Sequence, residues 1–332
     1  MTHPQSNAER RSRGHDSSHR NRGLAAKPAK GPRKRSALNP EYSTRRGSIY
    51  CCKAEEFFGS SRAKRYIGRV QLIFTSPPFP LNTKKAYGNL QGDQYIEWLA
   101  EFAPLFEQML TPTGSIVMEM GNAWEAGQPV MSTLALESLL KFLKQADLKL
   151  AQQFICYNPA RLPSPAQWVN VERIRLKDSY THLWWMAATE RPYADNRNVL
   201  KPYSPSMLRL LKTGKYNAGK RPSQHSIGKK SFLTNNSGAI PSNVLCFSNT
   251  GNGDPYQRYC RNRGLELHPA RMHMGLPEFF IKLLTKPGDL VLDPFAGSNT
   301  TGAAAERLKR RWIAIEARHD YVLSSIGRFV EE

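Results

Sequence analysis

The stretch of sequence that decides the fold is residues 290–302, which read LVLDPFAGSNTTG. A short apolar run ends in the carboxylate of Asp293, passes through a turn of small residues, and continues into a segment that starts with polar side chains. This order is typical of a buried strand, a tight turn and a helix at the edge of an open α/β sheet, where ligands bind. Ala296 and Gly297 would let a ligand approach the backbone closely, because neither has a bulky side chain.

The ligand at this turn is predicted to carry a positive charge. The stretch lacks the GxxxxGK[ST] pattern of a phosphate-binding loop, and a carboxylate at the strand end would repel a triphosphate. Glu316 follows the next apolar run, 23 residues after Asp293, which is close to the spacing at which an acidic residue meets a ribose diol. A nucleoside with a cationic amino-acid tail, such as S-adenosylmethionine, fits both acids. The side chains available to cap the helix and to hydrogen-bond this ligand are Ser298, Asn299 and Thr300.

A second polar turn, TSPPF, occupies residues 75–79 and follows another short apolar run. Pro77 and Pro78 fix the backbone and have no N–H groups, so the loop presents acceptors, namely the Ser76 hydroxyl and nearby carbonyls. Phe79 adds a flat apolar face. Acceptors beside an aromatic ring suit a planar ring that carries an exocyclic amine. The expected catalytic residues are therefore Ser76, Pro77, Pro78 and Phe79.

Alternating strand and helix signals surround both turns. A helix is expected after Asp93, with its apolar residues on one face, and Pro112 and Gly114 should end it. Strands separated by helices of about 10 to 15 residues predict a doubly wound, mostly parallel α/β sheet that is covered on both faces. The expected strands are 70–74, 115–120, 150–157, 290–293 and 312–316, and the other expected helices are 131–145, 277–284 and 301–308.

Charge divides the 332 residues into four segments. Lys and Arg number 48, and Asp and Glu 27, so the net charge is +21, which indicates a polyanionic partner because cations bound to phosphates release counterions. Residues 1–46 are basic, polar and poor in apolar side chains, which predicts a disordered basic tail. Residues 195–267 are also basic and rich in Gly, Asn and Ser, which predicts a loop-rich region. The ordered core should come from residues 47–194 and 268–332.

Composition argues against several classes of protein. No run of about 18 apolar residues is present, and no apolar segment follows the basic N-terminus, so neither a membrane span nor a signal peptide is expected. The five cysteines form no CxxC pair, which argues against a disulfide framework and a structural zinc site. His268 and His273 lack a third ligand nearby, so a structural role is expected for them and no metal. We therefore expect a soluble, cytoplasmic protein.

The two turns resemble motif IV and motif I of the DNA amino-methyltransferases. Their order, with motif IV first, resembles the permuted beta class of restriction-modification systems. The resemblance covers about residues 48–330 and implies a Rossmann-like methyltransferase fold that uses S-adenosylmethionine. An aromatic residue after SPP is typical of N4-cytosine enzymes, whereas N6-adenine enzymes usually carry Asp or Asn in place of Ser76. Further segments resemble N4-cytosine enzymes of the PvuII type, namely 84–89, 158–159, 162–165, 184–185, 221–223 and 268–271.

The resemblance also implies roles for single residues. The helix around 276–280 would wall the cofactor pocket as motif X. Where motif III commonly reads Gly-Asp, this chain has Lys53 in place of the Asp, so a carboxylate expected near the adenine is missing. Either backbone groups and a neighbour such as Glu55 hold the adenine, or the cofactor binds more weakly. Glu316 would hold the ribose, and the methionine end would be held by Asp293, Phe295, Gly297, Ser298 and Thr300.

The residue types indicate how such a reaction would proceed. Acceptors at Ser76 and the Pro77 carbonyl would draw on the two hydrogens of an exocyclic amine and concentrate its lone pair toward the sulfonium methyl. The base must leave the duplex to reach them, and Phe79 would pack against it. This displacement requires no metal.

Double-stranded DNA is the expected partner, with sequence reading assigned to the basic region 195–267. A restriction endonuclease of matching specificity is expected as a genetic partner only. Two alternatives stay open. One is N6-adenine methylation on the same scaffold, and the other is a catalytically inactive DNA-binding protein, which Lys53 and the basic tail would allow. The expected DNA-binding residues are Lys84, Lys85, Arg221, His225, Lys229 and Lys230.

Overall fold

The structure is a computed structural model, and it describes residues 38–79, 90–248 and 254–330. Most of the predicted basic tail lies outside the described residues, as do the predicted DNA-binding residues Lys84 and Lys85.

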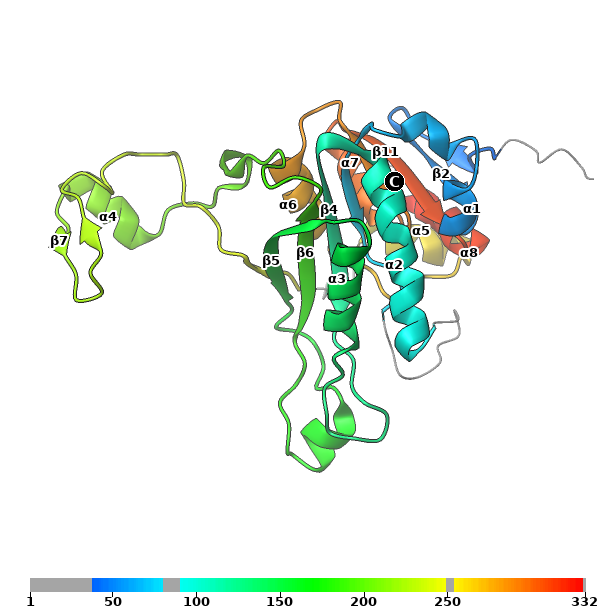
Figure 1. The fold of residues 1–332 in the computed structure, drawn as a ribbon, viewed down its shortest axis with the longest axis horizontal. Coiled ribbons are helices and arrows are strands. Elements are labelled where there is room, and N and C mark those ends of the chain that lie inside the picture. Colours follow the sequence, from blue (N-terminus) through cyan, green and yellow to red (C-terminus); the bar gives the residue numbers. More distant parts are fainter. Residues whose placement is uncertain (1–37, 80–89, 249–253, 331–332) are drawn as a thin grey trace, which may run out of the picture. The chain divides into compact units, whose positions relative to one another are not determined.

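Within the described residues, nine strands form one sheet (Figure 1). The strands from β2 to β4 in spatial order are all parallel, whereas β6 runs antiparallel to both of its neighbours and β1 is antiparallel to β2. The prediction of a mostly parallel α/β sheet is confirmed. In spatial order the strands are β1 (Tyr42–Ser43), β2 (Gly47–Cys51), β11 (Arg311–Glu316), β10 (Leu290–Asp293), β3 (Val70–Thr75), β4 (Leu110–Gly121), β6 (Tyr180–Ala187), β5 (Lys149–Tyr157) and β9 (Val244–Cys246).

Helices cover both faces of this sheet, and each face has its own apolar core. Because parallel strands are buried on both sides, β3 and β10 are buried along their whole length. One face packs against α1 (Ala54–Phe58), α2 (Gly92–Met109) and α3 (Leu134–Gln145). The other packs against α6 (Gly275–Leu284), α7 (Thr300–Arg307) and α8 (His319–Ser325).

The predicted helix after Asp93 is α2, and its expected apolar face is buried. The helix starts slightly earlier than expected, since its N-cap is Gln91. It ends before Pro112 and Gly114, but both residues belong to β4 and not to a loop. A Cβ on Gly114 would lie 2.9 Å from the Val70 carbonyl oxygen, so glycine allows β4 to run close beside β3.

Two predicted boundaries need correction. The predicted tail extends too far, because Tyr42–Ser43 pair with β2 as an edge strand. The region 195–267 also divides into two parts. Its first part holds a 3-10 turn (Asn196–Val199), α4 (Pro205–Thr213), which has no buried residue, and a separate hairpin of β7 (Gly219–Lys220) and β8 (Ser226–Ile227).

The second part belongs to the main body. β9 pairs with β5, and α5 (Pro255–Arg263) buries Tyr256 and Cys260 in a small cluster that includes Ile326. Spacing along the chain does not predict these long-range contacts. Among the described residues, no helix has the length and apolar character needed to cross a membrane.

Candidate active site

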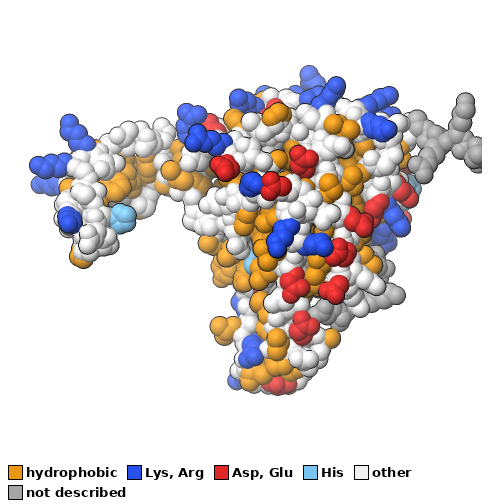
Figure 2. Space-filling view, viewed as in Figure 1, with side chains coloured by type: hydrophobic (Ala, Val, Ile, Leu, Met, Phe, Trp, Pro, Cys, Tyr) orange, Lys and Arg blue, Asp and Glu red, His pale blue; other side chains and the backbone are white. Residues whose placement is uncertain are grey.

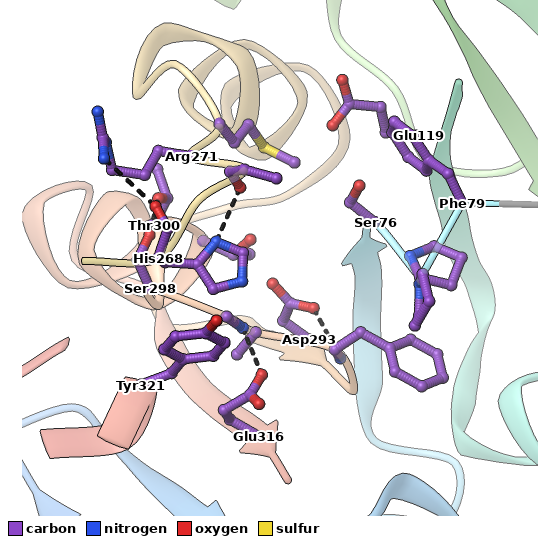
Figure 3. Close-up of a pocket in the computed structure, with 18 of the residues that line it drawn as sticks. Ser76, Phe79, Glu119, His268, Arg271, Asp293, Ser298, Thr300, Glu316 and Tyr321 are labelled. Carbon is purple, nitrogen blue, oxygen red and sulfur yellow. Dashed lines mark hydrogen bonds between the residues drawn. The ribbon is translucent and has the colours of Figure 1, made fainter. Parts of the chain in front are cut away.

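The two predicted turns meet at one edge of the sheet. β3 and β10 are hydrogen-bonded neighbours, and both strands end at this edge. The Thr75 hydroxyl donates to the Asp293 carboxylate over 2.8 Å, across 218 positions of sequence. Figure 3 shows Ser76 and Asp293 facing one cavity of about 1240 Å³. That volume lies above the range of about 300 to 1,000 Å³ that is usual for a small-ligand pocket, so a second planar group could enter beside a cofactor.

Asp293 supplies a buried negative charge to this cavity. Its side chain is 4% exposed, and burial raises the pKa of its carboxyl to about 6. Three donors oppose that rise, namely the hydroxyls of Thr301 and Thr75 and the backbone N–H of Phe295 at 3.1 Å. The carboxyl is therefore mostly ionised at neutral pH, although its side chain is almost fully buried.

Glu316 is held in place by backbone donors. The N–H of Gly297 donates to one carboxylate oxygen and the N–H of Arg318 to the other, each over 2.8 Å. Burial raises the pKa of Glu316, and backbone hydrogen bonds from Arg318, Gly297 and Ala317 act against that rise. The carboxylate has about four acceptor sites, so it can still accept a further donor, which suits a ribose hydroxyl.

Gly297 has a backbone conformation that favours glycine. Its φ is +51°, in the left-handed region, and a Cβ there would lie 2.8 Å from Nε2 of His268. The ring of His268 packs edge-on against Tyr321, with centroids 4.5 Å apart. Burial lowers the pKa of His268 to about 4, so the imidazole is neutral at physiological pH. This neutral ring lies against the Gly297 turn and lines the cavity.

Seven of the eight predicted cofactor-binding residues line the cavity, and Asn299 is the exception. Its amide is fully buried and caps α7, accepting a hydrogen bond from the Gly302 N–H at 3.1 Å. Its nitrogen donates to the hydroxyl of Tyr42. Asn299 is therefore a capping residue, and the structure does not place it on the cavity wall where its predicted ligand contact would be made. The seven that line the cavity are Asp293, Phe295, Ala296, Gly297, Ser298, Thr300 and Glu316.

The four predicted catalytic residues, Ser76, Pro77, Pro78 and Phe79, line the opposite wall of the same cavity. Ser76 forms a hydrogen bond with the carboxyl of Glu119, which comes from the end of β4. Thr181 donates to the same carboxyl over 2.9 Å. Burial raises the pKa of Glu119, and both hydrogen bonds lower it.

Glu119 is a site residue that the sequence reasoning missed. The available signal was a single acid inside the apolar strand expected at residues 115–120. Because β4 is parallel to β3, the end of that strand lies beside Ser76. Other cavity residues had no comparable local signal, since they come from segments that only the fold brings together. These are Trp98, Cys156, Arg161, Tyr321 and Arg328.

Lys53 lies at the cavity wall where a carboxylate was expected, and Glu55 lies there too. The Trp98 indole N–H donates to the Glu55 carboxylate over 2.8 Å. Trp98 also packs against Phe295, with ring centroids 5.6 Å apart. A carboxylate and two aromatic rings are therefore present at this wall in spite of Lys53.

The predicted DNA-binding residues that the structure describes do not line the cavity. Arg221 and His225 belong to the β7–β8 turn, where the Arg221 N–H donates to the His225 carbonyl over 2.8 Å. Lys229 and Lys230 are exposed just after β8. In the part of the chain that the structure covers, no three His, Cys, Asp or Glu side chains are grouped to bind a metal ion.

Comparisons with known proteins agree with this geometry. A family model described as a DNA methylase matches residues 70–326. Type II methyltransferase M.PvuII from Proteus hauseri is 42% identical over 294 residues, which are 88% of this chain and 86% of that protein.

Solved structures show the same fold. The PvuII DNA methyltransferase (cytosine-N4-specific) has a TM-score of 0.71 at 36% identity, covering 88% of this chain and 89% of that one. The M1.HpyAVI–SAM complex has a TM-score of 0.51 at 20% identity, covering 86% and 100%, and it supports the fold alone.

Proposed function

This chain belongs to the DNA methylase family, and we propose that it transfers a methyl group from S-adenosyl-L-methionine to the N4 amine of a cytosine in duplex DNA. One observation carries the proposal. The SPP turn, which presents acceptors for an amine, lies beside the acidic turn, which suits a cationic cofactor, and the Thr75–Asp293 hydrogen bond joins them. The choice of cytosine N4 is supported by Ser76 and by the relative described as cytosine-N4-specific.

The acidic side of the cavity fits S-adenosyl-L-methionine. The carboxylates of Asp293 and Glu316 match its ammonium group and its ribose hydroxyls, and the Gly297 turn leaves space where a side chain would intrude. We assign the methionine end to Asp293, Phe295, Ala296, Gly297, Ser298 and Thr300, and the ribose to Glu316. When bound, the cofactor supplies an electrophilic methyl group on a sulfonium.

Glu55 takes the place of the missing motif III acid in this proposal. Its carboxylate is positioned by Trp98 at the cavity wall, next to Phe295. One carboxylate oxygen accepts from Trp98, so the other can accept from the adenine amine. This assignment favours the first of the two alternatives raised by Lys53.

The SPP side activates the amine. The Ser76 hydroxyl oxygen and the Pro77 carbonyl accept the two N4 hydrogens, which moves the nitrogen lone pair out of conjugation with the ring. Phe79 provides an apolar surface for the base. Its ring lies against Gly121, where a Cβ would come within 2.4 Å of the ring, so it is held close to the end of β4.

Glu119 receives the proton that the amine loses. As the new N–C bond forms and the methyl leaves sulfur, N4 becomes an acidic ammonium and gives one proton to the Ser76 hydroxyl, which passes its own proton to the Glu119 carboxylate. Burial raises the pKa of Glu119, which makes it a better acceptor than an exposed carboxylate. Thr181 holds the carboxylate in position over 2.9 Å.

Sequence recognition is assigned to the basic region before β9. Figure 2 shows Lys and Arg side chains gathered over the segment that holds α4 and β7. Arg221, His225, Lys229 and Lys230 would contact phosphates or base edges there. A restriction endonuclease of the same specificity is the proposed genetic partner, in the cytoplasm of a microbial cell, and the transfer itself needs no metal.

Two measurements test the proposal. The full chain is incubated with a random-sequence duplex library and the cofactor, and the DNA is digested to nucleosides for mass spectrometry. N4-methylcytosine is expected, whereas N6-methyladenine would overturn the choice of base. DNA binding without any methyl transfer would favour an inactive DNA-binding protein. Sequencing of the modified library members gives the recognition site.

A further inference from the structure

The loop between β5 and β6 is an ordered projection that starts at the cavity. It covers residues 158–179, and we call it the β5–β6 projection. Asn158 and Arg161, at its base, line the cavity. In Figure 1 it extends beyond the ends of β5 and β6, at the bottom of the view. Because the start of β6 pairs with the end of β4, this edge of the sheet is the one that carries Glu119 and Ser76.

The β5–β6 projection exposes apolar side chains to an unusual degree. Leu162 is 80% exposed and Leu176 is 89% exposed, which are the two highest values among the large apolar residues that the structure describes. Val171 and Ile174, nearer the tip, are 69% and 48% exposed. Figure 2 shows apolar side chains over this end of the molecule. Scattered exposed leucines are common, but several in one short loop at the mouth of a cavity indicate a contact surface.

The β5–β6 projection is held in shape by hydrogen bonds between its two arms. The Asn158 N–H donates to the Ser179 carbonyl over 2.8 Å, and the Asp178 N–H to the Ser164 carbonyl over 3.0 Å. The Lys177 ammonium reaches from one arm to the carbonyls of Pro159 and Arg161 on the other. Such a loop loses little conformational freedom when it binds a partner.

The surface of the β5–β6 projection combines these apolar groups with cations. A hollow on it is lined by Leu176 together with Arg173, Arg175 and Lys177. Of its two acids, Asp178 is hydrogen-bonded to Asn122 over 2.8 Å, and Glu172 accepts from Gln167. A cationic surface with exposed leucines matches a nucleic acid, because the backbone is anionic and the stacked bases are apolar.

We propose that the β5–β6 projection keeps the target base pair open, with Leu162 occupying the space that the extruded base leaves in the duplex. This inference rests on the proposed function, since only a base that leaves the stack can reach Ser76. Leu162 directly follows Arg161, a cavity residue, and its side chain is exposed, so we assign it to the side from which the base enters. The cations of the hollow hold the adjoining phosphates, and Leu176 packs beside them.

The test compares two duplexes that carry the recognition site found in the library. In one duplex the target cytosine is paired with guanine, and in the other it lies opposite an abasic position, so that the pair is already open. Single-turnover methylation is measured with the wild type, Leu162→Ala and Leu140→Ala. Leu140, 56% exposed on α3, is the matched control.

Leu162→Ala is expected to slow methyl transfer to the paired duplex by about tenfold or more, because no leucine side chain then fills the space that the unstacked base leaves. On the open duplex the variant should react at nearly the wild-type rate. Leu140→Ala should match the wild type on both. A fluorescent cytosine analogue at the target position should brighten on binding the wild type and less on binding Leu162→Ala.

Three outcomes would overturn the inference. Wild-type rates for Leu162→Ala on the paired duplex would assign the exposed leucine to another partner, such as a protein. An equal loss on both duplexes would mean that Leu162 does not act on the base pair. If the library yields no methylated site, the proposed function itself fails, and the inference that rests on it fails with it.

Discussion

The hydroxyl of Thr75 donates a hydrogen bond to the buried carboxylate of Asp293 over 2.8 Å, which joins the ends of β3 and β10. Ser76 directly follows Thr75 in the chain. The small-residue turn that lines the acidic side of the cavity begins two residues after Asp293. A contact between two buried side chains therefore holds the SPP turn beside the turn that follows β10. An in-line displacement depends on such positioning, because small misplacements of the reacting atoms cost much rate.

Removal of this contact should destabilise the protein. Thr75→Val leaves the Asp293 carboxylate with one donor fewer, and the free energy of unfolding at pH 8 is expected to fall by about 1 to 3 kcal/mol. The loss should shrink in acid, where Asp293 is protonated and needs fewer donors. Urea denaturation at pH 8 and pH 5 measures both values. Thr213→Val, at an exposed helix end, should change stability little, and an equal effect of the two variants would contradict the role of Thr75.

Cofactor affinity should depend on pH through Asp293. Because burial raises the pKa of Asp293 to about 6, the protein without cofactor takes up a proton as pH falls through that value. The cationic cofactor prefers the ionised form, so its Kd should rise by about tenfold per pH unit well below 6 and stay flat above 7. Equilibrium binding between pH 5 and 8 measures this. Asp293→Asn should bind more weakly and lose the pH dependence, and a slope that survives in this variant would assign the proton to another group.

Ser76→Ala should separate chemistry from binding. Loss of the hydroxyl acceptor is expected to lower kcat by about a hundredfold, while the Kd for S-adenosyl-L-methionine changes little, since Ser76 lies on the wall opposite the cofactor turn. Single-turnover rates and equilibrium binding provide the two numbers. A variant that lost cofactor affinity as strongly as rate would refute the division of the cavity into two sides.

Glu119→Gln tests the proton acceptor without removing a side chain. Burial raises the pKa of Glu119, so the wild-type rate should fall on the acid side of neutrality as this carboxylate is protonated. The Gln variant should be slow at every pH and should lack that acid limb. Rate against pH under single turnover measures the difference. If the acid limb persists in Glu119→Gln, the group that titrates is Asp293 and not Glu119. The pH dependence of cofactor binding identifies the titration of Asp293 independently.

Gly297→Ala should harm the site more than a strained glycine elsewhere. Both Gly297 and Gly214 have positive φ values near +51° and +63°, but a Cβ meets His268 only at position 297 and open space at 214. Each substitution is expected to cost about 1 kcal/mol or slightly more from backbone strain. Only Gly297→Ala should in addition weaken cofactor binding by about tenfold or more. Similar affinities for both variants would mean that the turn tolerates a side chain.

Local pattern was sufficient for most of the central sheet and for both turns. The apolar runs that became β3 and β10 are buried along their whole length, so hydrophobicity alone marks them, and the proline and glycine positions that follow restrict the turns in any context. The predicted helix from residue 301 is α7, since its apolar face and polar start are local features.

Local pattern failed where a residue's role comes from a distant partner. Asn299 lies in a turn of small and polar residues that is typical of a ligand-binding site. In the folded protein its amide caps α7 and donates a hydrogen bond to the hydroxyl of Tyr42, which lies in a segment predicted as tail. In the sequence, Glu119 is a single acid within an apolar strand. Only the parallel pairing of β3 with β4 brings its carboxyl to Ser76.

By itself the sequence indicated five of the nine strands of the main sheet and the two turns that follow β3 and β10, and it predicted a positively charged ligand, because these features depend on residue type and on spacing over a few positions. The tertiary structure decided which of those groups face one another. Contacts such as Thr75 with Asp293, Glu119 with Ser76, and Glu55 with Trp98 join residues 43 to 218 positions apart, and they exist only when the pairing of strands and the packing of helices bring them together.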